Sequence, residues 1–409
     1  MNGAAGPHDV VVIGAGQAGL SVGHELAARG IAHVILERER VGSAWAHLWD
    51  SFRLNTPNWS VRLPGLPYDG PEPDGFMSRA EIVAHLERYA ALGDAPILGG
   101  IAVTAVERAG DGFELLTTAG AMRARTVVAC TGAFQTSFRP PSASTMPDDV
   151  VALDTRDYRN PAMLPDGTTL IVGNGQSGCQ IAEDLLDAGR DVVLSCGRAA
   201  WAPRRIGDHD LVWWVIENGF LDQTVHDLPT PAARFAANVT ASGVDGGHDL
   251  HPRKLRAKGA TIVGRFGGYR DGAIRFADDL ADSIAWGDAR YLDTVDDVRH
   301  LCGERGIPVP SLPDPEPFDA DVPTSVPASQ IGAVVFAGGF RPDYGWIRSK
   351  HVTDEMGFPL QHDGASTTNP GLFFAGVHFM RRRRSSLLCG IADDASVVAL
   401  GVAAHLSAH

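Results

Sequence analysis

The sequence has little cysteine, and the cysteines it has are widely spread. The five are Cys130, Cys179, Cys196, Cys302 and Cys389, with no C-x-x-C pair among them. This spacing argues against a disulfide framework, a dithiol active centre and a zinc site, and it predicts reduced thiols in a cytoplasmic protein. The histidines show no metal-ligand spacing that would change this expectation, so we expect no bound metal.

Long apolar runs and an excess of positive charge are lacking as well. No apolar run reaches about 18 residues, so we expect no membrane-spanning segment. Nine residues without signal-peptide character precede an apolar stretch at residues 10–13. Lysine and arginine number 35 against 49 acidic residues, a formal net charge of −14, which argues against nucleic acid as the main partner.

What the sequence does have is glycine, and a glycine-centred unit that occurs twice. The first unit is an apolar strand at residues 10–13, a G-x-G-x-x-G turn at 14–19, a helical pattern to about 29 and a strand at 33–36. The second repeats this order with a strand at 170–172, the turn at 173–178, a helical pattern to about 188 and a strand at 191–194. This strand–turn–helix–strand context is the one that a dinucleotide fingerprint requires.

Each glycine of the fingerprint has its own physical reason. The first permits a tight turn, the second lets the backbone approach a pyrophosphate, and the third allows the helix to pack closely on the strand. The start of the helix then presents free N–H groups to the phosphates. The loop residues expected to bind cofactor are Gly14, Gly16, Gln17 and Gly19 in the first copy, and Gly173, Gly175, Gln176, Ser177 and Gly178 in the second. For the two glutamines, helix capping is the structural alternative.

The residues after the second strand of each unit differ, and the difference predicts two different cofactors. Glu37 is a carboxylate where a ribose 2′-hydroxyl is expected, which suits FAD, and Arg38 follows it. The second copy has Ser195 and Arg198 there and no acid, so Arg198 could pair with the 2′-phosphate of NADPH. A solvated loop arginine is the alternative for Arg198.

The order of elements predicts an α/β protein with two Rossmann-type dinucleotide-binding domains, the NADPH domain inserted in the FAD domain. Alternating runs at 101–107, 113–118 and 121–130 predict a small β-meander in the FAD domain. We expect an FAD domain at 1–160 and 326–409, and an NADPH domain at 161–325 with a lid segment within 205–300. A proline-rich, acidic stretch at 310–327 predicts an irregular connection, and a helix is expected to start near Ser385 and Ser386 after the strand at 371–376.

With these units placed, the chain resembles the class B flavin-dependent monooxygenases along nearly its whole length, particularly bacterial relatives of the flavin-containing monooxygenases and the plant indole-pyruvate monooxygenases. Residues 14–19 match the FAD loop of that family, and residues 43–45 resemble the segment that passes the flavin. Residues 53–57 resemble a stretch whose asparagine, here Asn55, faces the flavin. The interdomain crossovers correspond to 130–132 and 337–339, and the flavin-closing segment to 371–376 and 387–395.

The resemblance implies an NADPH-dependent flavin monooxygenase that activates O2 as a flavin C4a-(hydro)peroxide. Such an enzyme oxygenates nitrogen, sulfur or a carbonyl carbon of a small organic substrate. Asn55 is then the catalytic candidate, as a hydrogen-bond donor near the peroxide, with a turn residue as the alternative. Trp45 would pack beside the flavin ring, or is an ordinary buried aromatic. The resemblance adds Thr131, Gly132, Gly376 and Leu388 to the cofactor-binding residues.

One family signature, F-x-G-x-x-x-H-x-x-x-Y, is eroded in the connection before the second unit. Only Tyr158 survives, and Asp154 stands where the family has histidine. Two alternatives therefore stay open: an NADPH oxidase or reductase without oxygen insertion, and a non-catalytic redox-sensing flavoprotein. The residues identify neither the substrate nor an oligomeric interface, and a homodimer is only an option.

Two further features near the C-terminus carry alternatives. The run from Arg381 to Arg384 could attract an anionic substrate or the NADPH phosphates, although a charge run is usually a solvated face. His378 could face the substrate, although a packed histidine is the more frequent arrangement.

Overall fold

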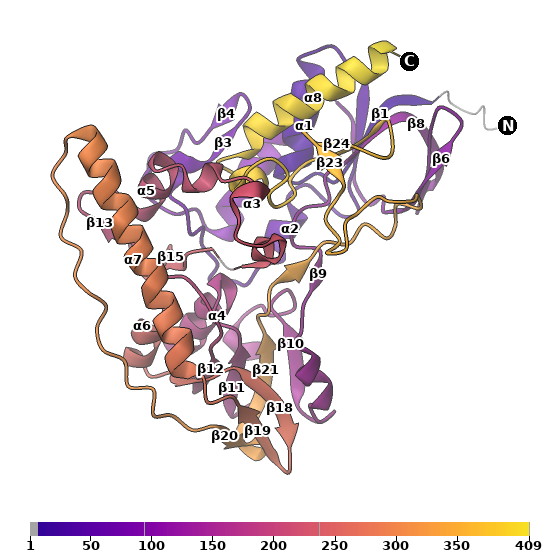
Figure 1. Cartoon of the computed structure of the whole chain (residues 1–409). Helices are drawn as coiled ribbons and strands as arrows, with labels where there is room; N and C mark the ends of the chain where they lie inside the picture. The colour runs from indigo at the N-terminus through magenta and orange to yellow at the C-terminus, as the bar shows by residue number, and fades with distance from the viewer. Residues whose placement is uncertain (1–6, 94, 237, 409) are drawn as a thin grey trace.

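Two α/β domains make up the molecule, which is described here by a computed structural model for residues 7–93, 95–236 and 238–408. One domain is built on a nine-stranded sheet and is called the first domain. The other is built on a five-stranded sheet and is called the second domain. Figure 1 shows the first domain above the second, with the extended crossover segments between them.

The first domain combines residues from both ends of the chain. Its strands are β1 (His8–Ile13), β2 (His33–Leu36), β5 (Ile97–Leu98), β6 (Val103–Ala109), β7 (Gly112–Thr117), β8 (Gly120–Ala129), β23 (Gln361–His362), β24 (Ala365–Ser366) and β25 (Leu372–Phe374). Its helices are α1 (Gln17–Ala27), α2 (Ser43–Ala46), α3 (Arg79–Ala91) and α8 (Ile391–Ala408). The main path runs β23-β24-β25-β8-β1-β2-β5, and β6, β7 and β8 form the predicted antiparallel meander.

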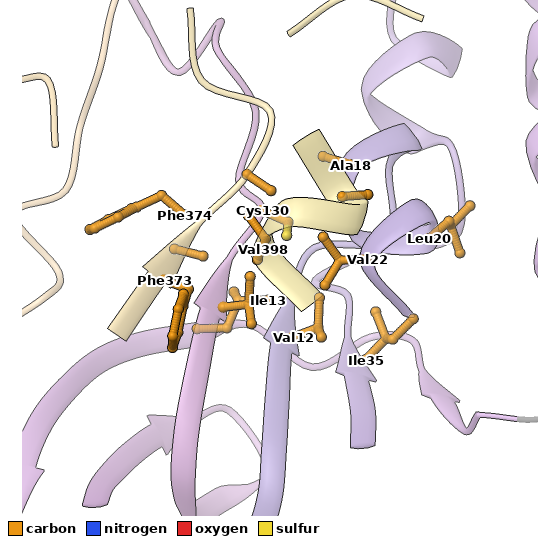
Figure 2. Packing of buried hydrophobic residues seen from close by; sticks show 14 of the residues in the cluster. Val12, Ile13, Ala18, Leu20, Val22, Ile35, Cys130, Phe373, Phe374 and Val398 are labelled. Carbon is orange, nitrogen blue, oxygen red and sulfur yellow. The ribbon is translucent and has the colours of Figure 1, made fainter. Parts of the chain in front are cut away.

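The core of the first domain forms where the central strand is covered by two helices. Val10, Val11 and Val12 of β1 are 0% exposed, as expected for a parallel strand buried on both faces. Figure 2 shows side chains of β1, α1, β25 and α8 meeting in this cluster. The packing joins the N-terminal dinucleotide unit to the C-terminal segment, so the two halves of the domain fold as one body.

The second domain is a parallel sheet with the order β10-β21-β11-β12-β17. Its strands are β10 (Val151–Asp154), β11 (Thr168–Val172), β12 (Val192–Ser195), β17 (Thr261–Val263) and β21 (Ile331–Phe336). Its helices are α4 (Gln176–Asp187), α5 (Leu211–Glu217), α6 (Pro252–Ala257) and α7 (Leu280–Arg305). These strands lie between β8 and β23 in the chain, so the expected insertion of one domain in the other is confirmed.

Strand pairing extends the second domain beyond the expected limits of 161 and 325. β10 and β21 pair with each other, and β21 pairs with β11, so both belong to the second sheet. The physical reason is that a strand leaving one domain gains hydrogen bonds by adding to the other sheet before the chain crosses over. The crossovers therefore lie nearer residues 130–150 and 337–340.

Small antiparallel sheets of two or three strands complete the fold. They are β3 (Arg62–Leu63) with β4 (Leu66–Pro67), β9 (Thr136–Ser137) with β22 (Phe340–Arg341), β13 (Arg205–Ile206) with β14 (His209–Asp210), β15 (Ala241–Ser242) with β16 (His248–Asp249), and β18 (Phe266–Arg270) with β19 (Ala273–Phe276) and β20 (Ser325–Pro327). Residues 306–324 contain no helix or strand and run along the outside of α7 to β20, as the irregular stretch predicted (Figure 1).

The helix expected to begin at Ser385 and Ser386 begins later. A 3-10 turn occupies Arg383–Ser386, and α8 starts at Ile391. A Cβ on Gly390 would lie 2.2 Å from the Arg384 carbonyl oxygen, so the chain folds back tightly on this turn before the helix can begin.

α8 is long and apolar enough in composition to cross a membrane. One face of it nevertheless belongs to the core of the first domain, where Val398 and Val402 are 0% exposed. Asp394 in its first turn is 2% exposed and forms an ion pair with Arg381 at 3.2 Å. The helix is therefore explained as a packed element of the first domain.

Candidate functional site

The first glycine loop has the backbone geometry of a dinucleotide cradle. Gly14 has φ of +105°, and a Cβ there would lie 2.6 Å from the Cys130 carbonyl oxygen. A Cβ on Gly19 would lie 1.8 Å from the Gly14 carbonyl oxygen, whereas one on Gly16 would meet nothing within 4 Å. Gly14 and Gly19 are thus required by the turn itself, and Gly16 faces open space where a phosphate can approach.

The N-terminus of α1 is free to bind an anion. Gly16 is its N-cap residue, and no side chain caps the first turn. The first N–H groups of the helix therefore have no side-chain acceptor and carry the positive end of the helix dipole. This arrangement fits the pyrophosphate of FAD.

Glu37 follows β2 beside this loop. The side chain is 8% exposed; Oε2 accepts a hydrogen bond from the Ala15 N–H at 2.8 Å, and Oε1 accepts one from the Glu39 N–H at 3.0 Å. The carboxylate is therefore fixed against the loop, where it suits a ribose hydroxyl. Arg38 is exposed, and its Nε lies 3.7 Å from Glu39 Oε1.

The C-terminal segment closes on the same loop. Trp45 donates from Nε1 to Gln17 Oε1 at 3.0 Å, and Gln17 donates from Nε2 to the Ser386 carbonyl at 3.4 Å. A Cβ on Gly376 would lie 2.6 Å from Cβ of Ala18, so only glycine allows this approach. Gln17, Trp45 and Gly376 are thus brought together around the first turn of α1.

Thr131, Gly132 and Leu388 lie at the edges of this region. Gln135 donates from Nε2 to Thr131 Oγ1 at 2.8 Å and to the Gly132 carbonyl at 2.9 Å. Leu388 is buried, and its carbonyl accepts from the Arg62 N–H at 3.1 Å. Gln135 carried no signal in the sequence, because an isolated loop glutamine is not distinctive.

The second loop repeats the first. Gly173 has φ of +112°, and its Cβ would lie 2.6 Å from the Ala337 carbonyl oxygen. A Cβ on Gly178 would lie 1.9 Å from the Gly173 carbonyl oxygen. Gly175 is the N-cap residue of α4, again without a side-chain cap, and Ser177 lies half-buried in the first turn. This loop fits a second dinucleotide.

Gln176 and Ser195 make internal contacts that the sequence did not reveal. Gln176 donates from Nε2 to the Ala241 carbonyl at 2.7 Å and accepts from the Ala241 N–H at 3.1 Å. Ser195 is 2% exposed, and its hydroxyl donates a hydrogen bond to the Gly264 carbonyl at 2.9 Å. Neither side chain is therefore free for phosphate. Arg198 is exposed and forms no ion pair within the described chain.

Asn55 lies where the two domains touch. Arg204 of the second domain donates from Nη1 to the Asn55 carbonyl at 2.6 Å, and the Asn55 side-chain amide makes no hydrogen bond to the residues that the structure describes. Arg204 is 1% exposed, and its guanidinium lies 4.3 Å from the ring centre of Phe76. The backbone of the candidate catalytic residue is thus held from the other domain while its amide remains available.

Arg204 is a buried residue at the domain boundary that the sequence analysis did not single out. Its Nε lies 2.9 Å from Asp210 Oδ2, although the angle is outside hydrogen-bond geometry. Burial lowers the pKa of the Arg204 guanidinium and raises the pKa of the Asp210 carboxyl, and their mutual attraction opposes both shifts. A buried ion pair of this kind costs desolvation energy, so it points to a positioning role.

Two glycines let the second domain approach this point closely. A Cβ on Gly243 would lie 1.9 Å from the Leu54 carbonyl oxygen, and one on Gly247 would lie 2.7 Å from the Phe76 ring. Gly243 lies two residues after Ala241, whose carbonyl accepts a hydrogen bond from the Gln176 side chain. A short path of contacts therefore connects the second glycine loop to Asn55.

The arginine run is not a solvated face. Arg381 pairs with Asp363 and Asp394, while Arg382 and Arg384 share Asp222 at 3.0 and 2.9 Å. Arg383 forms no ion pair in the described ranges. It donates instead to Gln223 Oε1 at 2.9 Å and stacks on Phe220 and Phe379, and burial lowers its pKa to about 10.

Asp222 and Gln223 belong to the segment that was expected to include a lid. Their bonds to the arginine run join this segment of the second domain to the flavin-closing segment of the first. Three arginines of the run, Arg382, Arg383 and Arg384, therefore connect the two domains.

His378 is a packed histidine. Its Nδ1 lies 2.8 Å from Ser386 Oγ, and its ring stands edge-on to Phe134 at 5.1 Å. Burial, with a smaller contribution from Arg383, lowers the His378 pKa to about 4, so the ring is neutral at neutral pH.

The remnant of the eroded signature is structural. Tyr158 is 0% exposed and donates to Asp184 Oδ2 at 2.5 Å, which ties the connection to α4. Asp154 pairs with Arg139 at 2.7 Å. The substituted position therefore carries an ion pair near the crossover.

No thiol is set up for catalysis. All five cysteines are unpaired, and burial raises the pKa of Cys179 to about 12 and that of Cys389 to about 11. A protonated, buried thiol is a poor nucleophile. Within the described ranges, no group of three or more histidine, cysteine or acidic side chains could hold a metal ion.

Comparisons with known proteins agree with this geometry. A family model for pyridine nucleotide-disulphide oxidoreductases matches residues 11–229. A relative from Geobacillus kaustophilus (strain HTA426), named an uncharacterized CzcO-like oxidoreductase, is 31% identical over 391 residues, which cover 95% of this chain and 96% of the relative. Indole-3-pyruvate monooxygenase YUCCA1 of Oryza sativa subsp. japonica is 32% identical over 180 residues, 43% of this chain and 44% of that protein.

A solved structure supports the fold. The flavin-containing monooxygenase from Stenotrophomonas maltophilia superposes with a TM-score of 0.69 over 98% of this chain and 99% of that chain, at 21% identity. Together with the two glycine loops, these matches confirm the expected resemblance and fold class. The chain belongs to the pyridine nucleotide-disulphide oxidoreductase family and is a class B flavin monooxygenase-like oxidoreductase.

Proposed function

We propose that the protein is an NADPH-dependent FAD monooxygenase that acts on a small organic molecule. In the balanced reaction, substrate, O2, NADPH and a proton give oxygenated substrate, NADP+ and water. One oxygen atom enters nitrogen, sulfur or a carbonyl carbon of the substrate, and NADPH supplies the two electrons that reduce the other atom. O2 and the substrate are the proposed small-molecule partners.

The cofactors would be held by groups already in place. The free start of α1 and the Glu37 carboxylate suit the pyrophosphate and ribose of FAD, and the free start of α4 with Arg198 suits NADPH. Bound FAD supplies hydride acceptance and the reduction of O2. The chain contributes orientation, because Gln17, Trp45 and Ser386 close over the first loop.

Asn55 is the observation that carries the proposal. Its backbone is fixed by Arg204 across the domain boundary, and its amide is uncommitted. A neutral amide can donate a hydrogen bond to oxygen at any physiological pH. Electrons from NADPH also have no disulfide of this chain to reduce, because all five cysteines are unpaired, so a diffusible acceptor such as O2 fits better than a protein disulfide.

The test is rapid-mixing spectroscopy of the flavin-loaded protein. The protein is reduced anaerobically with NADPH and, separately, with NADH, and is then mixed with oxygenated buffer. A near-ultraviolet absorbance band that persists before the oxidised flavin spectrum returns would support oxygenation. The Asn55→Ala variant should keep its rate of reduction by NADPH but release more H2O2 per NADPH, whereas failure of both nicotinamides to reduce the flavin would contradict any hydride transfer.

A second candidate is an NADPH oxidase that releases H2O2. The observation in its favour is the replacement of the signature histidine by Asp154, which is occupied by Arg139. In that case O2, NADPH and a proton give NADP+ and H2O2. Direct return to oxidised flavin with stoichiometric H2O2, in the presence as in the absence of candidate substrates, would favour it.

A further inference from the structure

A cavity of about 540 Å3 opens in the second domain, away from both glycine loops. It is lined by residues 203–205 and 247–250, by Glu183 of α4, and by Lys254, Leu255 and Lys258 in and just after α6. Its size is within the range of small-molecule pockets, about 300–1,000 Å3. No residue of 14–19 or 173–178 lines it, so it is separate from the dinucleotide sites.

Two carboxylates line this cavity, Glu183 and Asp249. Glu183 Oε1 lies 2.6 Å from His248 Nε2, and Glu183 Oε2 accepts from the Ser242 hydroxyl at 2.8 Å. These hydrogen bonds, together with the charges of His248 and Lys258, hold the Glu183 pKa low against the opposing effect of burial. Asp249 Oδ1 accepts the Arg204 N–H at 2.6 Å. Glu183 is therefore paired with cations, whereas Asp249 forms no ion pair within the ranges that the structure describes.

Two of the cations that line the cavity are not engaged. Arg205 and Lys254 are exposed, and neither forms an ion pair with any residue in the described part of the chain. The lining also has an apolar part, with Leu250 and Leu255 each 1% exposed. In a chain of net charge −14, a cavity lined by two cations without an ion pair and one such carboxylate, Asp249, has an excess of available positive charge, which favours an anion.

We propose that this cavity binds a small organic anion, with an apolar body against the leucines and a carboxylate or phosphate between Arg205 and Lys254. Arg204 lines the cavity and also holds the Asn55 backbone, so the ligand lies one side chain from the domain junction. The ligand would therefore act as an effector bound outside the reaction centre.

Calorimetric titration of the full-length, flavin-loaded protein tests this site, with NADP+ at saturation so that the dinucleotide loops do not take the anion. The probes are benzoate, phenyl phosphate and the neutral benzamide. We expect one equivalent of an anionic probe to bind, at least about tenfold more tightly than benzamide. Comparing the affinities of benzoate and phenyl phosphate shows whether the site prefers a carboxylate or a phosphate.

The variant Arg205→Ala/Lys254→Ala removes the two cations that have no ion pair. Both are exposed, so folding should be unaffected. It should weaken binding of the anionic probes about tenfold or more and leave benzamide unchanged. Arg270→Ala is the matched control, because Arg270 is an exposed arginine on β18 outside the cavity, and it should have no effect. Equal binding of benzoate and benzamide, unchanged affinity in the double variant, or no saturable anion binding up to about 10 mM would each overturn the proposal. None of these readouts depends on oxygenation.

Discussion

The two glycine loops of this protein are almost identical in backbone, and they differ in the residues that come after the second strand of each unit. Gly14 and Gly173 have φ of +105° and +112°, and a Cβ on either would lie 2.6 Å from a carbonyl oxygen of the neighbouring crossover. The third glycine of each loop would place a Cβ within 1.9 Å of the first glycine's oxygen. The same backbone arrangement was thus built twice on two different sheets.

The side chains after these strands set the two loops apart chemically. Glu37 is hydrogen-bonded to the first loop through the Ala15 N–H at 2.8 Å. In the second unit the corresponding link runs the other way: Asn174, a neutral residue of the loop itself, accepts through Oδ1 the N–H of Gly197, which follows β12, at 2.9 Å. A buried carboxylate repels a phosphate and a neutral amide does not, so the two loops can share a geometry and select different dinucleotides.

The largest expected effect comes from filling the turn of either loop. Gly19→Ala should yield protein without bound flavin, and Gly178→Ala should retain flavin but lose reduction by NADPH. Each new Cβ would overlap a carbonyl oxygen, and overpacking of this kind costs about 1–3 kcal/mol or more. Absorbance of the purified protein and anaerobic reduction by NADPH measure the two losses.

Gly303→Ala is the control for these substitutions, because a Cβ on Gly303 in α7 would meet nothing within 4 Å. Loss of flavin from the Gly178→Ala variant would show that the loops are not independent. Both glycines would then be needed for folding, and the two variants would not distinguish one dinucleotide site from the other.

The next effect concerns the contact by which the second domain reaches the first. Arg204→Met leaves Asp210 buried without its partner, which should lower the free energy of unfolding by about 3–5 kcal/mol. It also frees the Asn55 carbonyl, so amide hydrogen exchange should quicken in the peptide around residues 53–59. Chemical denaturation and exchange mass spectrometry measure the two effects.

The double variant Arg204→Met/Asp210→Asn separates positioning from stability. It should recover part of the lost stability, because the uncompensated carboxylate is gone, while exchange around Asn55 stays fast. If exchange returned to the wild-type rate in this variant, Arg204 would have no positioning role.

Removing the carboxylate of the first loop should have a smaller effect. Glu37→Gln keeps the shape but weakens a charge-assisted hydrogen bond, worth about 1.5–3 kcal/mol, so FAD affinity should fall about 10- to 100-fold. Glu39→Gln is the control, since that side chain is exposed and beside the same loop. Fluorescence titration of the apoprotein with FAD measures both, and equal affinities would remove Glu37 from the site.

The parts that sequence predicted are those in which short-range pattern carries the information. Strand, glycine turn and helix succeed one another within each unit, so both loops, the meander and the inserted domain could be predicted. The contacts that were missed join residues distant in the chain: Arg204 and Asn55 are 149 positions apart. The residues that precede and follow Arg204 and Asn55 in the chain do not reveal this contact, because local sequence does not show whether an arginine will be buried.

The arginine run is a second case in which contacts between residues distant in the chain were missed. Its charges predicted either an anion site or a solvated face, and neither describes Arg382 and Arg384, which share Asp222 from the other domain. The start of α8 was placed too early for a similar reason. The tight turn at Gly390 depends on a contact with the Arg384 carbonyl, which no propensity reports.

The smallest expected effect tests what distinguishes the second loop. Arg198 is exposed after β12 and forms no ion pair in the described residues, whereas the neighbouring Arg265 is paired with Asp279. Arg198→Ala should therefore raise the KM for NADPH about tenfold and leave the KM for NADH unchanged, since only NADPH carries the 2′-phosphate. Arg265→Ala should change either value less, because its charge is already neutralised. An unchanged preference for NADPH in the Arg198 variant would make Arg198 a solvated loop residue, and the lack of a carboxylate after β12 would have to account for nucleotide choice alone.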